Sequence, residues 1–509
     1  MSPLQRLDAI VVGSGPNGLA AAVVLAAAGL SVRVYEASEV AGGGCRTAEL
    51  TLPGFHHDVC SAGHPLALAS PFFRRYGLEA RGVRLLQPEV PFAQPIGGSH
   101  AVAAFRDVAM TASALENKND GRAYRRLFGP LVRSWKAIAD ATLSSYRAVP
   151  SGLIHVAPFG AKGLRSAESL ARRFEGAGPR ALVAGVAAHS MQRLDAPLTS
   201  GIALLLTSLA HGVGWPLVEG GSARIVDAMV AELRAGGTEL VTSERIRSLA
   251  DLPPARAVLL DVSPRTMAAL AADRLPQRYV RQLHGVRYGP GVCKVDWALS
   301  GPVPWTAEVG RRAGTLHLGG TFEEIASAEA DVAAGRHPDR PYVLTVQPGV
   351  VDRTRAPEGK HTLWTYCHVP SGSDIDMSEA IASQIERFAP GFSDLVQAKA
   401  VRTASAMEEE NANYVGGDIG CGVQDLRQTF ARPVARWNPY RVPIPGVYLC
   451  SSATPPGPGV HGRCGELAAR VALKEVFGVS RVQLSPERST TDSDDATPRS
   501  SLQARPPGR

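Results

Sequence analysis

The N-terminal stretch carries a glycine motif between two segments that read as buried strands. Residues 8–12 are mostly aliphatic, an alanine-rich helical segment follows the motif, and residues 31–36 form a second apolar run that ends in an acid. The motif is Gly13-Ser14-Gly15-Pro16-Asn17-Gly18. A Gly-x-Gly-x-x-Gly turn in this setting is typical of a βαβ unit that binds a dinucleotide.

Each part of the motif has a physical reason. Gly13 permits a tight turn out of the strand, and Gly15 lets the backbone approach a pyrophosphate. Gly18 lets the helix pack closely on the strand, and the helix N-terminus offers free N–H groups to phosphates. Glu36 stands where a carboxylate can accept both hydroxyls of an adenosine ribose. A chance turn is the alternative in a chain with 52 glycines. Because every flanking element is in place, we predict nucleotide binding.

A second glycine loop follows Glu36 and narrows the choice of nucleotide. It reads Gly42-Gly43-Gly44-Cys45-Arg46-Thr47. The loop resembles the second FAD-binding motif of the flavoprotein superfamily that contains phytoene desaturases, carotenoid isomerases and amine oxidases. A flat loop would let the isoalloxazine end of the cofactor pass, and Arg46 can neutralise a phosphate or fix the loop. We therefore predict FAD as the cofactor, bound in part by Gly42, Gly43, Gly44 and Arg46.

Two later segments extend the resemblance. The segment around Ile246 resembles the family's return to the FAD-binding domain, in which the backbone at this position pairs with the adenine edge. Near the end, a strand at 446–452 leads into a helix at 466–477 through Gly457-Pro458-Gly459-Val460-His461-Gly462. No strand and ribose acid follow this second glycine motif. We therefore predict that Gly459 and Val460 belong to a helix N-terminus that faces the flavin and stabilises negative charge on its reduced ring.

The resemblance implies an α/β protein with a two-lobe FAD-binding fold, Rossmann-type and GR2/p-hydroxybenzoate-hydroxylase-like, with an inserted mixed α+β substrate domain. At 509 residues the chain exceeds a single typical domain. We expect the FAD-binding domain to comprise residues 1–80, 215–275 and 411–479. The substrate domain is expected to comprise a mainly helical part, 81–214, and a sheet, 276–410. Residues 480–509 have almost no apolar content and are expected to be a disordered tail.

The same resemblance implies an FAD-dependent oxidoreductase of the bacterial phytoene-dehydrogenase-related branch, with relatives among pyridine nucleotide-disulphide oxidoreductase domain-containing proteins. The expected reaction is dehydrogenation or desaturation. An apolar, isoprenoid- or polyene-like substrate passes a hydride to flavin N5, and oxygen or a quinone reoxidises the flavin. No second complete βαβ fingerprint is present, which argues against a built-in NAD(P)H site.

His64 is the candidate catalytic residue, because in flavoproteins that resemble this one the segment after the glycine loop enters the cofactor pocket near the ring. Asp58 of the same segment is a second candidate. A loop histidine and a turn-capping aspartate are the alternatives. Lys294 and Asp296 alternate with apolar residues along a strand, so we expect them on a solvated face.

Three other functions share this fold. A carotenoid-isomerase-like enzyme would use reduced flavin without net oxidation of the substrate. An amine-oxidase-like enzyme would need an aromatic cage, but aromatic residues make up only 6% of the chain and are scattered. A lipid- or prenyl-binding escort protein would not need a complete FAD site. The substrate part carries no motif that ties it to carotenoids, so the substrate stays open.

The composition of the chain limits which binding partners and which cellular compartment we expect. The net charge is +7, but the basic residues are scattered and no stretch mixes them with stacking aromatics, so we expect no nucleic-acid partner. The charge is compatible with peripheral contact with an anionic membrane. Seven widely spaced cysteines form no CxxC pair, which indicates a cytoplasmic location and no metal site. Residues 198–218 lack formal charge, but the polar residues and glycines among them favour a buried helix over a membrane span.

Overall fold

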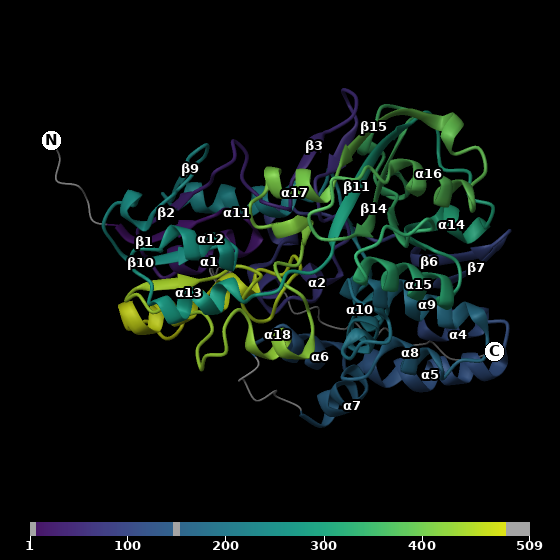
Figure 1. Ribbon diagram of the computed structural model, residues 1–509, viewed down its shortest axis with the longest axis horizontal. Coiled ribbons are helices and arrows are strands. Elements are labelled where there is room, and N and C mark those ends of the chain that lie inside the picture. Colours follow the sequence, from purple (N-terminus) through teal and green to yellow (C-terminus); the bar gives the residue numbers. More distant parts are fainter. Residues whose placement is uncertain (1–6, 146–152, 485–509) are drawn as a thin grey trace, which may run out of the picture.

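The computed structural model describes residues 7–145 and 153–484, and two sheets organise them (Figure 1). The first is a five-stranded sheet in the order β16-β10-β1-β2-β9, and all of its strand pairs are parallel. Its strands are β1 (Leu7–Val12), β2 (Val32–Tyr35), β9 (Glu239–Val241), β10 (Ala255–Leu260) and β16 (Val447–Leu449). Segments from both ends of the chain and from its middle therefore build one sheet.

Helices cover both faces of the five-stranded sheet, which is why β1 is an almost unbroken aliphatic run. Ala9 and Val11 pack in one core with α1 (Pro16–Ala26) and α19 (Arg463–Ala472). Ile10 and Val12 pack in another with α12 (Pro264–Leu270) and α13 (Gln277–His284). The two helices α1 and α19 touch closely, because a Cβ at Gly465 would overlap the carbonyl oxygen of Asn17. The predicted Rossmann-type fold is confirmed.

The second sheet has seven strands in the order β15-β11-β14-β13-β12-β6-β7. Its neighbouring strands are antiparallel except for the parallel pair β12 and β6. The strands are β6 (Val90–Gly97), β7 (His100–Ala104), β11 (Gly291–Leu299), β12 (Ala313–Leu318), β13 (Val343–Val346), β14 (His361–Val369) and β15 (Val396–Arg402). The range 81–214, expected to be mainly helical, thus also supplies two strands to this sheet, β6 and β7.

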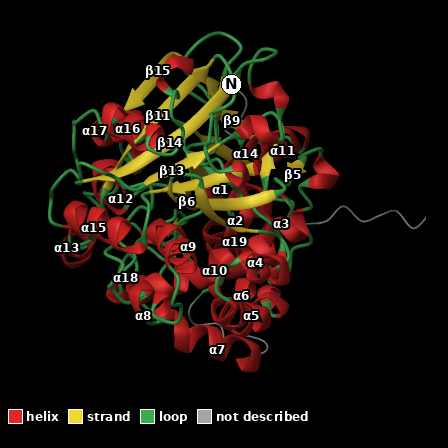
Figure 2. Ribbon diagram, turned by 90° about the vertical axis from the view of Figure 1, so that its right-hand side faces the viewer, coloured by secondary structure: helices red, strands yellow, loops and turns green. Residues whose placement is uncertain are grey.

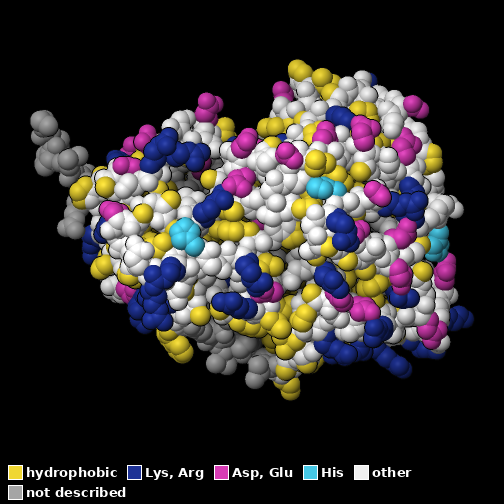
Figure 3. Space-filling model, viewed as in Figure 1, with side chains coloured by type: hydrophobic (Ala, Val, Ile, Leu, Met, Phe, Trp, Pro, Cys, Tyr) yellow, Lys and Arg dark blue, Asp and Glu magenta, His cyan; other side chains and the backbone are white. Residues whose placement is uncertain are grey.

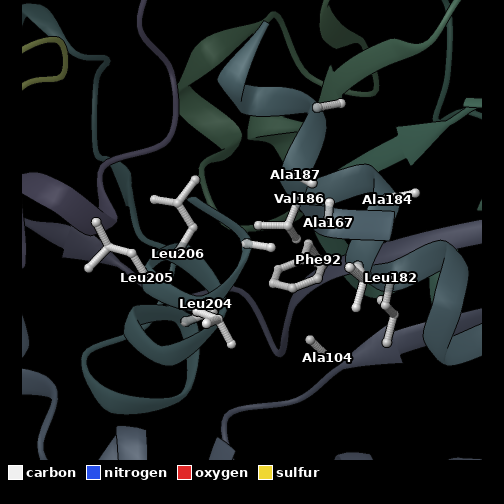
Figure 4. Close-up of a cluster of buried hydrophobic side chains, with 14 of the residues drawn as sticks. Phe92, Ala104, Ala167, Leu182, Ala184, Val186, Ala187, Leu204, Leu205 and Leu206 are labelled. Carbon is white, nitrogen blue, oxygen red and sulfur yellow. The ribbon is translucent and has the colours of Figure 1, made fainter. Parts of the chain in front are cut away.

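A bundle of helices lies beneath the seven-stranded sheet (Figure 2). It comprises α4 (Val108–Ala114), α5 (Lys118–Arg133), α6 (Trp135–Thr142), α7 (Leu153–Gly163), α8 (Ala167–Ala171), α9 (Ala177–Ala187) and α10 (Thr199–Gly212). Phe92 of β6, Leu182 of α9 and Leu204 of α10 meet in the core between sheet and bundle (Figure 4). The opposite face of the sheet packs against α16 (Ser378–Glu386) through residues such as Trp297 and Ile385.

Short elements connect these layers. They are β3 (Thr47–Glu49), β4 (His56–Asp58), α2 (Pro65–Ala69), α3 (Pro71–Tyr76), β5 (Leu85–Leu86), β8 (Leu217–Val218), α11 (Ala223–Ala235), α14 (Glu308–Arg312), α15 (Phe322–Ala333), α17 (Ala404–Glu410) and α18 (Leu426–Ala431). Helix α10 spans most of the uncharged stretch at 198–218. No helix in the described ranges is both long enough and apolar enough to cross a membrane.

The structure differs from two of the sequence-based expectations. Lys294 and Asp296 are fully buried, so the prediction of a solvated face is wrong. They lie on the face of β11 against which β4 packs, where His57 is 3.6 Å from Asp296, and in the sheet they pair with Tyr366 and Trp364 of β14. Of the expected disordered tail, residues 485–509 lie outside the described residues, but Leu484 is buried in the core of the first lobe.

Candidate functional site

A cavity of about 890 Å³ runs from the carboxyl ends of the five-stranded sheet to the helix-facing side of the seven-stranded sheet. This is the position at which open α/β sheets bind ligands. It brings together thirteen of the predicted site residues: Gly13, Ser14, Gly15, Pro16, Asn17, Glu36, Gly43, Gly44, Arg46, His64, Ile246, Gly459 and Val460. Gly18 and Gly42 do not line the cavity, and instead shape the turns beside it.

The first glycine turn has the geometry that the motif requires. Gly13 adopts a φ of +99°, which favours glycine, and its N–H donates to the carbonyl of Tyr35 at 2.8 Å. A Cβ at Gly18 would overlap the carbonyl oxygen of Gly13, so only glycine permits the observed packing of α1 on β1. The turn therefore delivers the N-terminus of α1 to the cavity, where its partial positive charge favours phosphate.

Glu36 is held by the turn that it faces. One of its carboxylate oxygens, Oε2, accepts hydrogen bonds from the Ser14 amide at 3.0 Å and the Ser14 hydroxyl at 2.5 Å. The other, Oε1, accepts from the Ser38 amide at 2.8 Å. Glu36 is buried but lines the cavity. These three donors fix the carboxylate at the carboxyl end of β2, where a ribose would lie.

The second glycine loop packs directly on the first. The Gly42 amide donates to the Ser14 hydroxyl at 3.2 Å, and a Cβ at Gly43 would lie 3.1 Å from the Cα of Gly15. Arg46 closes the loop, since its Nε donates to the Gly43 carbonyl at 2.8 Å. The guanidinium also forms an ion pair with Glu410 at 3.0 Å. Arg46 therefore fixes the loop while remaining at the cavity wall.

The return and C-terminal segments complete the cofactor end of the cavity. The Glu244 amide donates to the Glu36 carbonyl at 2.9 Å, which places the backbone just before Ile246 beside the ribose acid. Gly459 lies against Leu66, because a Cβ there would lie 2.6 Å from Leu66 Cδ1. Gly462 forms the N-cap of α19, so the segment is a helix N-terminus as the sequence predicts.

Asp261 was missed as a site residue. It directly follows β10 and lines the cavity, and its Oδ2 accepts a hydrogen bond from the Gly18 amide at 2.9 Å. Burial, against the lowering effect of the Gly18 amide and with a smaller contribution from the charge of Glu36, raises the pKa of Asp261 to about 7. An acid at the carboxyl end of the strand beside β1 was the available signal, because this edge of the sheet faces the ligand.

His64 is buried at the cavity wall and makes one side-chain hydrogen bond, 2.8 Å long, to the Ser222 hydroxyl. That hydroxyl donates its hydrogen to the Ser61 carbonyl at 2.6 Å, so it must accept from the Nε2–H of His64. The Nδ1 atom of His64 is then a lone-pair acceptor without a hydrogen-bond partner in the described part of the chain. Burial lowers the pKa of His64 to about 4, so the ring is neutral near pH 7.

Asp58 has a structural environment. Its carboxylate accepts from the Ser222 amide at 2.7 Å and the Thr47 hydroxyl at 2.9 Å, and it pairs with buried Arg355 at 3.0 Å. Burial raises the pKa of Asp58, but Arg355 and these donors together hold it below the usual value. The carboxylate thus anchors Ser222, and through it His64, and does not line the cavity.

These features together fit FAD. The N-terminus of α1 suits the pyrophosphate, and the carboxylate of Glu36 suits the ribose. The flat second loop leaves room for the part of the cofactor that leads to the flavin ring. The cavity continues beyond this loop to His64 and Gly459, which is farther than a mononucleotide needs. The residues present therefore suit a dinucleotide whose second half lies against the 459–462 helix N-terminus.

Comparisons with known proteins agree with this geometry. Residues 11–74 match the family model of an NAD(P)-binding Rossmann-like domain. The chain is 24% identical to pyridine nucleotide-disulfide oxidoreductase domain-containing protein 2 of Rattus norvegicus, over 92% of this chain and 94% of the relative. It is 25% identical to phytoene desaturase of Cercospora nicotianae, over 71% and 61%. The predicted resemblance is confirmed.

Solved structures show the same fold. An oxidoreductase from Methanosarcina mazei superposes with a TM-score of 0.62 at 15% identity, covering 92% of this chain and all of that one. Cyclohexylamine oxidase from Brevibacterium oxydans superposes with a TM-score of 0.56 at 17% identity, covering 93% of this chain and all of that one. The chain has a Rossmann-like FAD-binding fold, and it is similar in sequence to a phytoene desaturase and in fold to an amine oxidase.

Proposed function

We propose that the protein is an FAD-dependent dehydrogenase or desaturase that oxidises an apolar, isoprenoid- or polyene-like molecule, and that oxygen or a quinone reoxidises it. The observation that carries this proposal is the continuity of the cavity, in which residues that fit FAD and an apolar wall line one space. The apolar wall comprises Phe159, Met191, Leu198, Ile202, Leu205, Leu206, Trp215, Leu344, Val346, Trp364 and Tyr366.

The charges in the cavity lie at its cofactor end. Glu36, Arg46 and Asp261 belong to the turns described above, and Glu410 is paired with Arg46. The two other charged residues that line the cavity, Glu244 and Arg245, directly precede Ile246. The apolar wall carries no formally charged side chain. An ammonium group placed against it would lose its hydration without gaining a carboxylate partner. This favours an uncharged apolar substrate over the amines that the structural neighbours are named for.

FAD, when bound, supplies the two-electron acceptor, and the chain supplies binding and orientation. The N-terminus of α1 and Glu36 hold the nucleotide half, and the 42–46 loop guides the flavin half. The N-terminus of α19 favours negative charge at the edge of the ring. The apolar wall excludes water and holds the substrate. His64 keeps its Nδ1 atom as a hydrogen-bond acceptor without a partner among the described residues.

The surface supports access from a membrane. Helix α7 supplies Phe159 and Gly163 to the cavity wall, while its Ile154 is 80% exposed. Hydrophobic side chains gather at the lower edge of the face in Figure 3, where α7 lies. We propose that α7 rests on a membrane surface from which an apolar substrate enters. Co-sedimentation with anionic vesicles tests this, and substitution of Ile154 by Glu should release the protein.

An anaerobic titration of the flavin-loaded protein tests the proposed reaction. Phytoene or another isoprenoid polyene in detergent should bleach the oxidised flavin and yield a product lighter by two hydrogens. Altered double-bond geometry at unchanged mass would instead indicate an isomerase. Bleaching by simple amines but not by polyenes would indicate an amine oxidase, and tight polyene binding without bleaching would indicate an escort protein.

A further inference from the structure

A partly buried histidine and a fully buried one meet at the apolar part of the cavity. His189, in the 3₁₀ turn Ala188–Ser190 after α9, lies with its Nε2 3.1 Å from the Nε2 of His317 on β12. His189 lines the cavity, whereas His317 lies behind it and is fully buried. The rings of Trp215 and Phe92 pack around the pair, at 5.7 Å from His189 and 5.3 Å from His317. The pair is therefore a fixed polar feature in an aromatic setting.

The contact between the two Nε2 atoms determines which ring nitrogens of His189 and His317 carry hydrogens. Burial lowers the pKa of His189 to about 3 and that of His317 well below its usual value, so both rings are neutral. A neutral pair has one hydrogen between its two Nε2 atoms. The Nδ1 atom of His317 is buried without a hydrogen-bond partner among the described residues. A buried N–H without a partner is costly, so Nδ1 of His317 is the bare atom and its Nε2–H donates to His189.

The hydrogen bond from His317 leaves His189 with a hydrogen-bond donor at its other ring nitrogen. Since its Nε2 accepts from His317, its single hydrogen is on Nδ1, which makes no hydrogen bond with the described part of the chain. A second unsatisfied group lies nearby. Thr315 precedes His317 by two positions on β12, so both side chains lie on the same face of the sheet. Thr315 lines the cavity, and its hydroxyl is buried without a partner in the described ranges.

The contacts of Trp215 show where the histidine pair lies relative to the cofactor end of the cavity. Trp215 packs on His189, and its indole nitrogen would lie 2.7 Å from a Cβ at Gly63, the residue before His64. One aromatic ring thus separates the segment that carries His64 from the histidine pair. His64 and His189 both line the cavity.

We propose that His189 and Thr315 bind a neutral oxygen, a hydroxyl or carbonyl group, on the otherwise apolar substrate. The inference rests on the proposed function and narrows its substrate class to isoprenoid alcohols, aldehydes or ketones. The Nδ1–H of His189 donates to the oxygen, and the Thr315 hydroxyl donates to it or accepts from it. The neutral pair offers no counter-charge, which excludes ammonium and carboxylate groups as the preferred partner.

Matched ligands test the proposal on the flavin-loaded protein. Geraniol, geranial, the hydrocarbon myrcene and geranylamine differ mainly in the polar group. Binding is read from quenching of tryptophan fluorescence, because Trp215 and Trp364 line the cavity. We expect geraniol and geranial to bind about tenfold more tightly than myrcene, which corresponds to one or two neutral hydrogen bonds.

Two variants and a control separate recognition from folding. Thr315→Val removes only the hydroxyl and should reduce the preference for geraniol over myrcene about fivefold, with myrcene affinity unchanged. His189→Phe should remove most of the remaining preference. Thr345→Val is the matched control, because Thr345 is buried on β13 with an unpartnered hydroxyl but does not line the cavity. It should leave the preference intact.

The outcomes also separate this inference from the proposed function. Equal affinity for geraniol and myrcene in flavin-loaded protein, or tighter binding of geranylamine, would overturn the inference and leave the flavoenzyme in place. Loss of preference in Thr345→Val as large as in Thr315→Val would overturn it too. A protein that keeps the alcohol preference but takes up no flavin would contradict the proposed function alone.

Discussion

The Gly18 amide donates a 2.9 Å hydrogen bond to the carboxylate of Asp261, which stands 243 positions later in the chain. The contact ties the glycine turn of the first βαβ unit to the end of β10. It also places a buried acid beside the expected pyrophosphate site. A group in this position links the stability of the fold to pH.

Asp261→Asn tests that link. Burial raises the pKa of Asp261 to about 7, so between pH 4 and 7 the folded state binds a proton that the unfolded state has released. Asp261 therefore stabilises the fold at low pH, and this contribution is lost as the pH rises through 7. Between pH 5 and pH 8 the wild type should lose about 2–3 kcal/mol more unfolding free energy than Asp261→Asn. Denaturant unfolding at the two pH values measures this, and equal losses would contradict it.

Gly18→Ala should damage the nucleotide site through packing. The new Cβ would overlap the Gly13 carbonyl and force α1 away from β1. Overpacking of this kind costs about 1–3 kcal/mol. Flavin content per protein should fall sharply in the same variant. Gly97→Ala is the control, because its Cβ would meet open space, and it should retain full flavin content. Normal flavin content in Gly18→Ala would show that the turn does not hold the cofactor.

The Arg46–Glu410 pair should matter for cofactor affinity more than for folding. Arg46→Ala removes both the hydrogen bond to the Gly43 carbonyl and the ion pair with Glu410, so the side chain no longer holds the second loop in place. Glu410→Gln keeps the hydrogen bond of Arg46 to Gly43 and removes the charge that Glu410 presents to Arg46 and to Arg402. We expect FAD to dissociate more readily from Arg46→Ala than from Glu410→Gln, with similar melting temperatures for the two apoproteins. Equal FAD affinity in wild type and Arg46→Ala would contradict the role of the loop.

Asp296 should be the most sensitive member of the buried charge cluster on β11. It pairs with buried Lys294 and with Arg402 at 3.1 Å, so Asp296→Asn leaves Lys294 without its carboxylate partner, while Arg402 keeps its ion pair with Glu410. Loss of one partner from a buried pair costs about 3–5 kcal/mol. Asp331→Asn is the control, since its pair with Arg336 is exposed and should contribute about 0–1 kcal/mol. Thermal unfolding that does not separate the two variants would contradict this account.

The sequence allowed the cofactor half of the fold to be predicted because its signals are local. The 13–18 turn, the acid at the end of β2 and the 42–46 loop lie within one short stretch, and each residue type has its own physical reason. The structure brings nearly all of these residues to one cavity. Their individual roles in binding remain predictions.

The substrate half could not be predicted in the same way. Alternation along β11 shows that the two faces differ, but it does not show that β4 packs on the face that carries Lys294 and Asp296, so their burial was missed. Asp261 and the His189–His317 pair depend on contacts between residues far apart in sequence. Histidines in apolar segments read as ordinary core residues until the fold brings their rings together.

The most direct test of the central claim is the absorbance spectrum of the purified protein, before and after denaturation and filtration. We expect flavin bands near roughly 370 and 450 nm, with the chromophore passing the filter as noncovalent FAD. A colourless protein that takes up no added FAD would contradict the claim that this cavity serves a flavin-dependent oxidoreductase.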